Sequence, residues 1–194
     1  MRVANDCHLT YCTNIHPGET WPEVRRNLER YLLSVKGQLA PRQGFGVGLR
    51  LSAVAARALA LPATLAEFKS FLHANDLYVF TLNGFPYGPF HGEPVKERAY
   101  LPDWRAEDRL DYTNLLADLL VQLLPDEPGL EGSISTVPGA FKPHMDTPEK
   151  IAQFTDVMIR HVAYLVRVRE RSGRTIGLAL EPEPFCFLET IEET

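Results

Sequence analysis

The strongest constraint on the fold is the alternation of short apolar, β-prone runs with longer stretches of helical periodicity. Five runs have the length and composition of strands: His8–Thr13, Gly46–Ser52, Leu77–Leu82, Ser133–Val137 and Ile176–Leu180. Helical stripes of apolar residues lie between them. This alternation is typical of an α/β fold with a parallel sheet.

Short motifs mark where several of the helices begin and end. Four such signals are capping-box pairs at Thr20 with Glu23 and at Thr64 with Glu67, a helix start at Thr147, and a C-cap glycine at Gly173. A capping box satisfies two amide donors of the first helical turn, and a glycine after the last turn ends a helix.

The number of units favours an incomplete barrel. A closed (β/α)8 barrel needs eight units and typically about 250 residues, whereas this chain supplies about five strands and four helices. A further capping-box pattern at Thr190–Glu193 predicts the start of one more helix. We expect residues 1–194 to form a single, incomplete TIM-barrel domain, with a five-stranded doubly wound fold as the alternative. The unpaired first and fifth strands would be edges that favour self-association.

Composition limits the partners and the compartment. The net charge of -5 is well mixed, so no basic patch indicates nucleic acid or an anionic membrane. The three cysteines form no C-x-x-C pair, which favours reduced thiols. No signal-peptide pattern and no apolar run of about 20 residues is present. We expect a soluble, cytoplasmic protein without a membrane span or a nucleic-acid partner, whose partner is a small-molecule metabolite.

Polar residues follow every expected strand, at the end where parallel α/β proteins carry their sites. They are Cys12, Asn14, His16, Arg50, Ser52, Asn83, Thr136, Glu181 and Glu183. A carboxylate that ends a buried strand, as Glu181 does, must be paired, protonated or metal-bound. Glu183 points to the same side if the backbone stays extended. Carboxylates, histidine and water suit a hard divalent cation, although a metal site needs three or four convergent ligands.

The stretch from Asn83 to about Arg105 has no periodic pattern and is rich in glycine, proline and aromatic residues. Asn83 with Gly84 signals a turn, and loops of this length are usually functional. The aromatic side chains either cover the mouth of the expected barrel or stack on a substrate. His161, by contrast, lies on the apolar stripe of a helix, which indicates a core position. No nucleophile elbow and no dinucleotide fingerprint is present.

Four segments carry longer motifs: Leu9–Trp21, Leu82–Gly92, Gly132–Gly139 and Leu178–Pro184. Together they resemble the EboE family of metabolite-traffic proteins, which belongs to the xylose-isomerase-like, sugar phosphate isomerase/epimerase group of TIM barrels. The resemblance implies a TIM barrel and a divalent metal (Mn, Mg, Zn or Co). The first metal ligand of that group is a glutamate ending the fifth strand, which matches Glu181 or, second, Glu183. The other ligands come from strands six to eight, which this sequence does not supply.

Two functions follow as hypotheses. The first is a metal-dependent isomerase or epimerase, active when the barrel is complete, that acts on a sugar-like or polyol substrate. The residues assigned to it are His16, Asn83 and His91 for catalysis, Glu181 and Glu183 for the metal, and Asn14, Phe85, Tyr87 and Thr136 for the substrate. The alternative is a non-catalytic protein that binds a prenylated metabolite precursor, or an inactive fragment.

Overall fold

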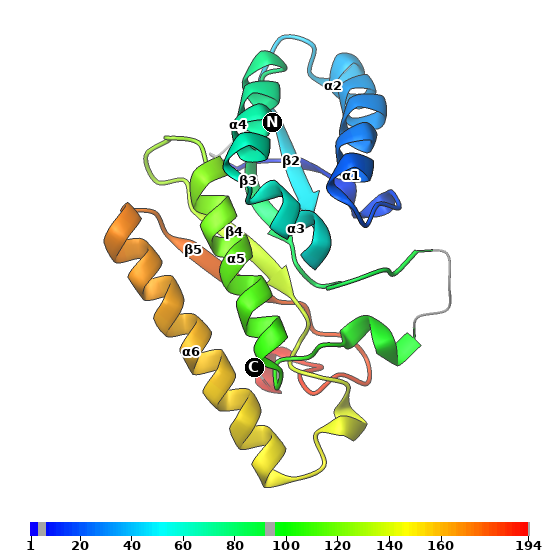
Figure 1. The fold of residues 1–194 in the computed structure, drawn as a ribbon, viewed down its shortest axis with the longest axis vertical. Helices are drawn as coiled ribbons and strands as arrows, with labels where there is room; N and C mark the ends of the chain where they lie inside the picture. The colour runs from blue at the N-terminus through cyan, green and yellow to red at the C-terminus, as the bar shows by residue number, and fades with distance from the viewer. Residues whose placement is uncertain (4–6, 92–95, 194) are drawn as a thin grey trace.

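A five-stranded parallel sheet forms the centre of the molecule (Figure 1). The computed structural model describes residues 1–3, 7–91 and 96–193. The strands are β1 (Thr10–Cys12), β2 (Phe45–Arg50), β3 (Leu77–Asn83), β4 (Gly132–Thr136) and β5 (Ile176–Leu180). Every neighbouring pair is parallel. The α/β class and the parallel sheet that the alternation predicts are therefore confirmed.

Helices follow each of the first four strands and lie on one face of the sheet (Figure 1). They are α1 (Trp21–Asn27), α2 (Leu33–Leu39), α3 (Ala53–Leu59), α4 (Pro62–Ala74), α5 (Glu107–Leu123) and α6 (Pro148–Ser172). A π-helical turn, Leu28–Leu32, joins α1 to α2 in one continuous run. Right-handed crossovers that always step in the same direction place their helices on the same side of a sheet.

The strands follow one another across the sheet in the order of the sequence, β1-β2-β3-β4-β5. A doubly wound sheet instead reverses direction at a switch point, and no such reversal occurs here. Within the described residues β1 pairs only with β2 and β5 only with β4, so the sheet is open at both edges.

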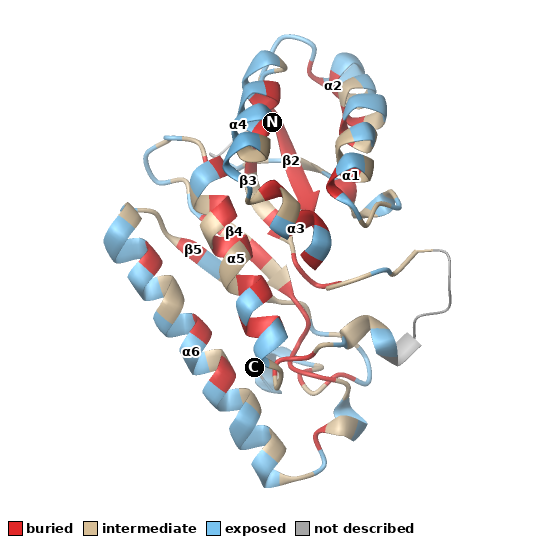
Figure 2. Cartoon of the chain, in the orientation of Figure 1, coloured by how far each residue is buried: buried red, intermediate tan, exposed pale blue. Residues whose placement is uncertain are grey.

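The two faces of the sheet differ in character. Leu82 and Ile134 are register partners on the face that packs against the helices, and both are fully buried. Thr81 and Ser133, on the other face, are hydroxylic and half-buried, and Ser133 Oγ donates to Thr81 Oγ1 (2.8 Å). Figure 2 shows the buried positions gathered on the strands and on the sides of the helices that face them. Since side chains alternate along a strand, the apolar core lies between the sheet and its helices.

Most of the predicted helix ends are correct. Glu23 Oε2 accepts from the amide of Thr20 (2.9 Å), Thr147 Oγ1 accepts from the amide of Lys150 (3.4 Å), and Gly173 adopts φ 70°. The box at Thr64 and Glu67 is wrong, because α4 begins at Pro62 with Leu61 as its N-cap. Proline is already suited to the first helical position, so the helix starts before the threonine.

The turn predicted at Asn83 and Gly84 is also wrong, because Asn83 is still paired as the last residue of β3 and the chain bends only from Phe85 onward. The amide of Gly84 donates to Ser135 O (2.9 Å). A Cβ at this glycine would lie 2.7 Å from Leu116 Cδ1 and 3.0 Å from Ser135 O. Glycine is therefore needed here for a close approach of β3 to α5 and β4.

The long loop after β3 contributes a second core. It contains a 3-10 helix, Lys96–Tyr100, and then returns to the sheet. Trp104 is fully buried at its end, among Phe85, Leu110, Val137 and Val157. The aromatic residues of this loop thus serve partly to fill the space between β3, β4, α5 and α6.

None of the helices in the described parts of the chain is long and apolar enough to cross a membrane.

Candidate functional site

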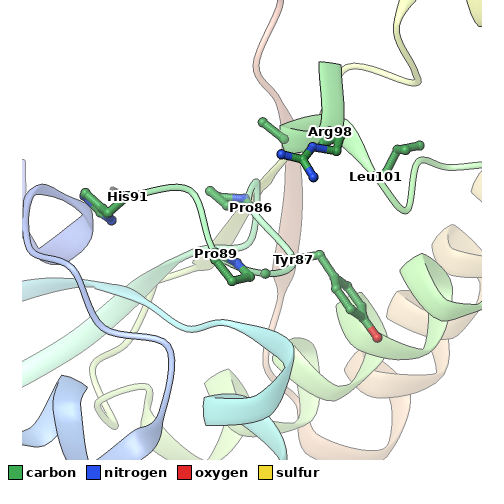
Figure 3. A pocket seen from close by; sticks show the side chains of 8 residues that line it. Pro86, Tyr87, Pro89, His91, Arg98 and Leu101 are labelled. Atoms are coloured by element: carbon green, nitrogen blue, oxygen red, sulfur yellow. The ribbon is translucent and has the colours of Figure 1, made fainter. Parts of the chain in front are cut away.

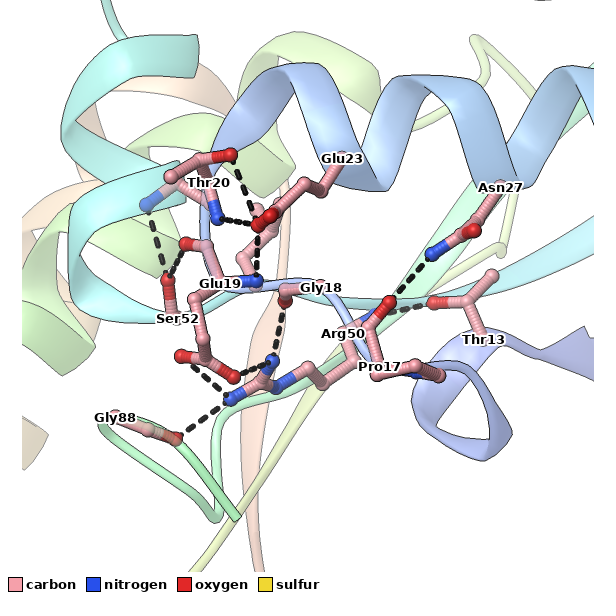
Figure 4. Close-up of polar contacts among 12 residues, drawn as sticks. Thr13, Pro17, Gly18, Glu19, Thr20, Glu23, Asn27, Arg50, Ser52 and Gly88 are labelled. Atoms are coloured by element: carbon pink, nitrogen blue, oxygen red, sulfur yellow. Dashed lines mark hydrogen bonds and ion pairs between the residues drawn. The ribbon is translucent and has the colours of Figure 1, made fainter. Parts of the chain in front are cut away.

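The buried side chain of Arg50 joins two loops at the carboxyl end of the sheet (Figure 4). Arg50 ends β2, and its side chain is 1% exposed. Its guanidinium donates to both carboxylate oxygens of Glu19, with distances of 2.7 Å to Oε1 and 3.3 Å to Oε2. It also donates to the carbonyl oxygens of Gly18 (2.6 Å) and Gly88 (2.7 Å). The Arg50 guanidinium therefore connects the two loops: its bidentate ion pair with Glu19 holds the loop after β1, and its hydrogen bond to Gly88 O holds the loop after β3.

Two hydroxyl groups extend this network. Thr13 Oγ1 accepts from the amide of Arg50 (2.8 Å). Ser52 Oγ accepts from the amide of Ala55 (3.1 Å), which caps α3, and donates to the carbonyl oxygen of Glu19. The strand ends of β1 and β2 and the start of α3 thus form one hydrogen-bonded unit beneath the loops.

A cleft of about 470 Å³ lies between the loop after β3 and the 3-10 helix Lys96–Tyr100. The side chains that line it come from Pro86, Tyr87, Pro89, His91, Arg98, Ala99 and Leu101. Figure 3 places His91 at one end of the cleft and Leu101 and Tyr87 at the other, with the two prolines and Arg98 between them. The two prolines make part of the wall rigid and apolar, and His91 and Arg98 add two nitrogen-bearing side chains.

The fold brings His16 and His91, 75 positions apart in the sequence, close enough for their charges to interact. Partial burial and the nearby His91 both lower the pKa of His16. The His16 ring stacks on Tyr31, with centroids 4.2 Å apart, and its Nε2 lies 2.7 Å from the hydroxyl of Tyr11. His91 also borders a second hollow, of about 490 Å³, beside the loop Pro17–Thr20.

Two predicted site residues carry a buried polar atom without a hydrogen-bond partner among the described residues. These atoms are Asn83 Oδ1 and His91 Nδ1. Asn83 stands level with Arg50 of β2 and Ser135 of β4, and it is the last residue of the strand that leads into the cleft. Buried polar atoms are almost always paired with protein, water or ligand, so both atoms are available to water or to a ligand at this end of the sheet.

The predicted substrate residues are divided between the cleft and the core. Tyr87 lines the cleft, and its hydroxyl accepts from Arg57 Nη2 (3.1 Å). Asn14 is half-buried in the 3-10 turn Thr13–Ile15. Phe85 is buried in the second core, and the fully buried Thr136 Oγ1 accepts from Trp104 Nε1 (3.0 Å). Both of these last two side chains support the walls of the site rather than line the cleft.

The predicted metal ligands follow β5. The amide of Glu181 donates to Thr136 O (3.1 Å), which continues the pairing of β4 with β5. Glu183 Oε2 accepts from the hydroxyl of Tyr100 (2.8 Å), which ties this segment to the 3-10 helix beside the cleft. Burial and this carboxylate raise the pKa of Tyr100. In the part of the chain that the structure describes, no three His, Cys, Asp or Glu side chains gather as a metal site.

Sequence reasoning missed Glu19 and Arg98. The signal for Glu19 is physical: Arg50 ends a fully buried strand, so its charge requires a carboxylate from a neighbouring loop. Glu19, in the loop after the adjacent strand, supplies it. Arg98 gave no signal, because only the folding of the long loop brings it to the cleft.

A scan against models of protein families found no match for this sequence, and neither did searches of curated proteins and of solved structures.

Proposed function

We propose that this protein binds a small, hydroxyl-bearing metabolite at the carboxyl end of its sheet, in the cleft between the loop after β3 and the 3-10 helix Lys96–Tyr100. One observation carries the proposal: among the described residues, a buried atom without a hydrogen-bond partner occurs on His91, which lines the cleft, and on Asn83, which ends the strand leading to it. Leaving a buried acceptor or donor unpaired costs about 1–3 kcal/mol. A ligand with several hydroxyl groups can donate to one atom and accept from another, and so offsets this cost.

The proposal includes an incomplete TIM barrel as the architecture. Its support is the sequential strand order, the single layer of helices and the position of the cleft at the carboxyl ends of the strands. Each of these features also occurs in the first five units of a (β/α)8 barrel.

The catalytic form of the proposal is a metal-dependent isomerase or epimerase. Glu181 and Glu183 would hold part of the coordination shell of a divalent cation, which polarises a substrate oxygen when bound. His16, Asn83 and His91 would orient the substrate, and Tyr100 would hold Glu183 in place. Two carboxylates satisfy only part of such a shell, since hard cations take six or more oxygen ligands. The binding step is therefore the better supported part.

A protein that carries a prenylated ligand is the second candidate. The prolines and Leu101 give the cleft an apolar middle that suits such a chain. Two aromatic residues that would favour it, Phe85 and Trp104, are instead packed in the second core.

Calorimetric titration with D-xylose and with a panel of pentoses, hexoses and polyols tests the proposal. We expect Asn83→Ala and His91→Ala each to weaken binding at least about 10-fold, the effect of one lost hydrogen bond. His73→Ala, at an exposed histidine of α4, is the control and should leave binding unchanged. Adding Mn²⁺ or EDTA distinguishes metal-dependent binding, which EDTA should abolish, from binding that needs no metal. No binding across the panel, with the fold intact, would reject the proposal.

A further inference from the structure

One side of α6 is apolar and uncovered. Its exposed apolar residues, which we call the α6 stripe, are Ile151, Ile159, Val162 and Val166. Ile159 is 62% and Val162 is 53% exposed. The spacing of three, four, seven and eight residues places them along one side of the helix. The opposite side of α6 packs on α5 and the sheet through Val157, His161 and Val168.

The α6 stripe borders an apolar groove of about 560 Å³. Leu180 of β5 and the following Phe187 and Leu188 form the other wall. Strand β5 has no neighbour on this side in the described structure, so the groove continues to the open edge of the sheet. A contiguous apolar surface of this kind marks an interaction site, and its shape suits an amphipathic helix.

The charges of α6 point to the kind of helix that fits. Residues 146–156 contain three acidic side chains and one lysine, a net charge of -2. Residues 157–172 contain four arginines and one glutamate, a net charge of +3. Glu107 and Asp118 of α5 neutralise two of these positive charges by pairing with Arg160 and Arg171. This half of the helix thus keeps a net charge of +1. A second α6 lying antiparallel would therefore set an acidic end against a basic end. It would also align the two helix dipoles favourably.

We propose that the groove is the interface of a homodimer in which the α6 helices of two copies pack antiparallel about a twofold axis near Ile159. The α6 stripe is self-complementary in this arrangement, as a twofold interface requires. Each copy covers the apolar groove of the other, and Ile151 of one copy lies beside Val166 of its partner. The site at the carboxyl end of the sheet is not involved, so this inference stands independently of the proposed function.

Sedimentation velocity on the whole chain tests whether the dimer forms. We expect twice the mass of one chain at about 100 µM, and Val162→Glu should weaken association about 100-fold by burying a charge at the interface. Val54→Glu is the matched control, because Val54 on α3 is equally exposed (58%) and lies outside the α6 stripe. Circular dichroism verifies that each variant is folded. A monomeric wild type, or a Val162→Glu dimer as strong as the wild type, would overturn the proposal.

Disulfide cross-linking tests the antiparallel orientation, in a background with Cys7→Ser and Cys12→Ser; the remaining Cys186 is buried. Ile159→Cys should cross-link to its own copy, because it lies near the axis. Ile151→Cys and Val166→Cys should cross-link only when the two variants are mixed. Cross-linking of each of these two variants alone would indicate parallel helices and would reject the antiparallel dimer.

Discussion

The Arg50 network and the α6 stripe are two regions of one molecule that differ in how completely they are covered. Arg50 is buried, with a bidentate carboxylate and two carbonyl oxygens around its guanidinium. The α6 stripe, in contrast, exposes branched apolar side chains to solvent. Within a single chain, substitutions in the first region should therefore cost stability, and substitutions on the second should alter association instead.

The largest expected effect is at Arg50. We expect Arg50→Met to lower the free energy of unfolding by about 4 kcal/mol, because it leaves Glu19 without its partner and frees two loops. Arg57→Met is the control: Arg57 is exposed and makes one hydrogen bond to Tyr87, so its loss should stay below about 1 kcal/mol. Urea unfolding measures both values. Equal losses in the two variants would mean that the Arg50 network does not stabilise the fold.

The second effect is a pH dependence that arises at His161, between α5 and α6. The His161 ring is fully buried, its Nδ1 lies 2.8 Å from Asn114 Oδ1, and burial lowers its pKa to about 4. Because an unfolded histidine titrates near pH ~6.5, the unfolded state takes up the proton first as the pH falls. The contribution of the neutral His161 to the free energy of unfolding is therefore complete above pH ~6.5. The free energy of unfolding should decrease by about 3 kcal/mol between pH ~6.5 and pH ~4.

Urea unfolding across this pH range checks the prediction. His161→Gln cannot titrate, so its stability should change less over the same interval than that of the wild type. His73→Gln, at an exposed position of α4, should keep the wild-type slope. If all three proteins lose the same stability, other groups cause the pH dependence.

The third effect contrasts two glycines of the covered and the open parts of the sheet. Gly84→Ala should cost about 2 kcal/mol, because the new methyl group would press on Leu116 and on the Ser135 carbonyl. Gly177→Ala, on β5, should cost almost nothing, since its nearest atom, Gly132 O, is 3.8 Å away. Thermal unfolding compares the two variants. A larger loss at Gly177 would show that the exposed side of β5 is covered in solution.

The order and type of the elements could be predicted from the sequence, because apolar runs bounded by turn signals depend only on local residues. Strand β5 is predicted with its observed bounds, Ile176–Leu180. The candidate site could be predicted only as a set of strand ends. The pairing of Arg50 with Glu19, and the burial of Phe85, depend on how loops from distant parts of the chain meet. No local pattern carries that information.

The predicted metal ligands Glu181 and Glu183 show the same limit. The prediction takes the strand before them to be fully buried, but in β5 only Ile176 is buried, and Glu183 accepts a hydrogen bond from the hydroxyl of Tyr100. Tyr100 is 83 positions away, in a 3-10 helix that no periodicity predicts. The metal site that the resemblance implies therefore stays a prediction. What the structure shows is that one of its two predicted ligands, Glu183, is hydrogen-bonded to Tyr100.

The smallest effect tests two threonines with the same sequence signal. Thr147 Oγ1 accepts from the amide of Lys150 at the start of α6, so Thr147→Ala should cost about 1 kcal/mol. Thr64 carries the same kind of signal but lies inside α4, where alanine is the better helix former. Thr64→Ala should therefore be neutral or stabilise by about 0.5 kcal/mol. Urea unfolding of both variants decides the point: a loss at Thr64 as large as that at Thr147 would place the start of α4 at the threonine, not at Pro62.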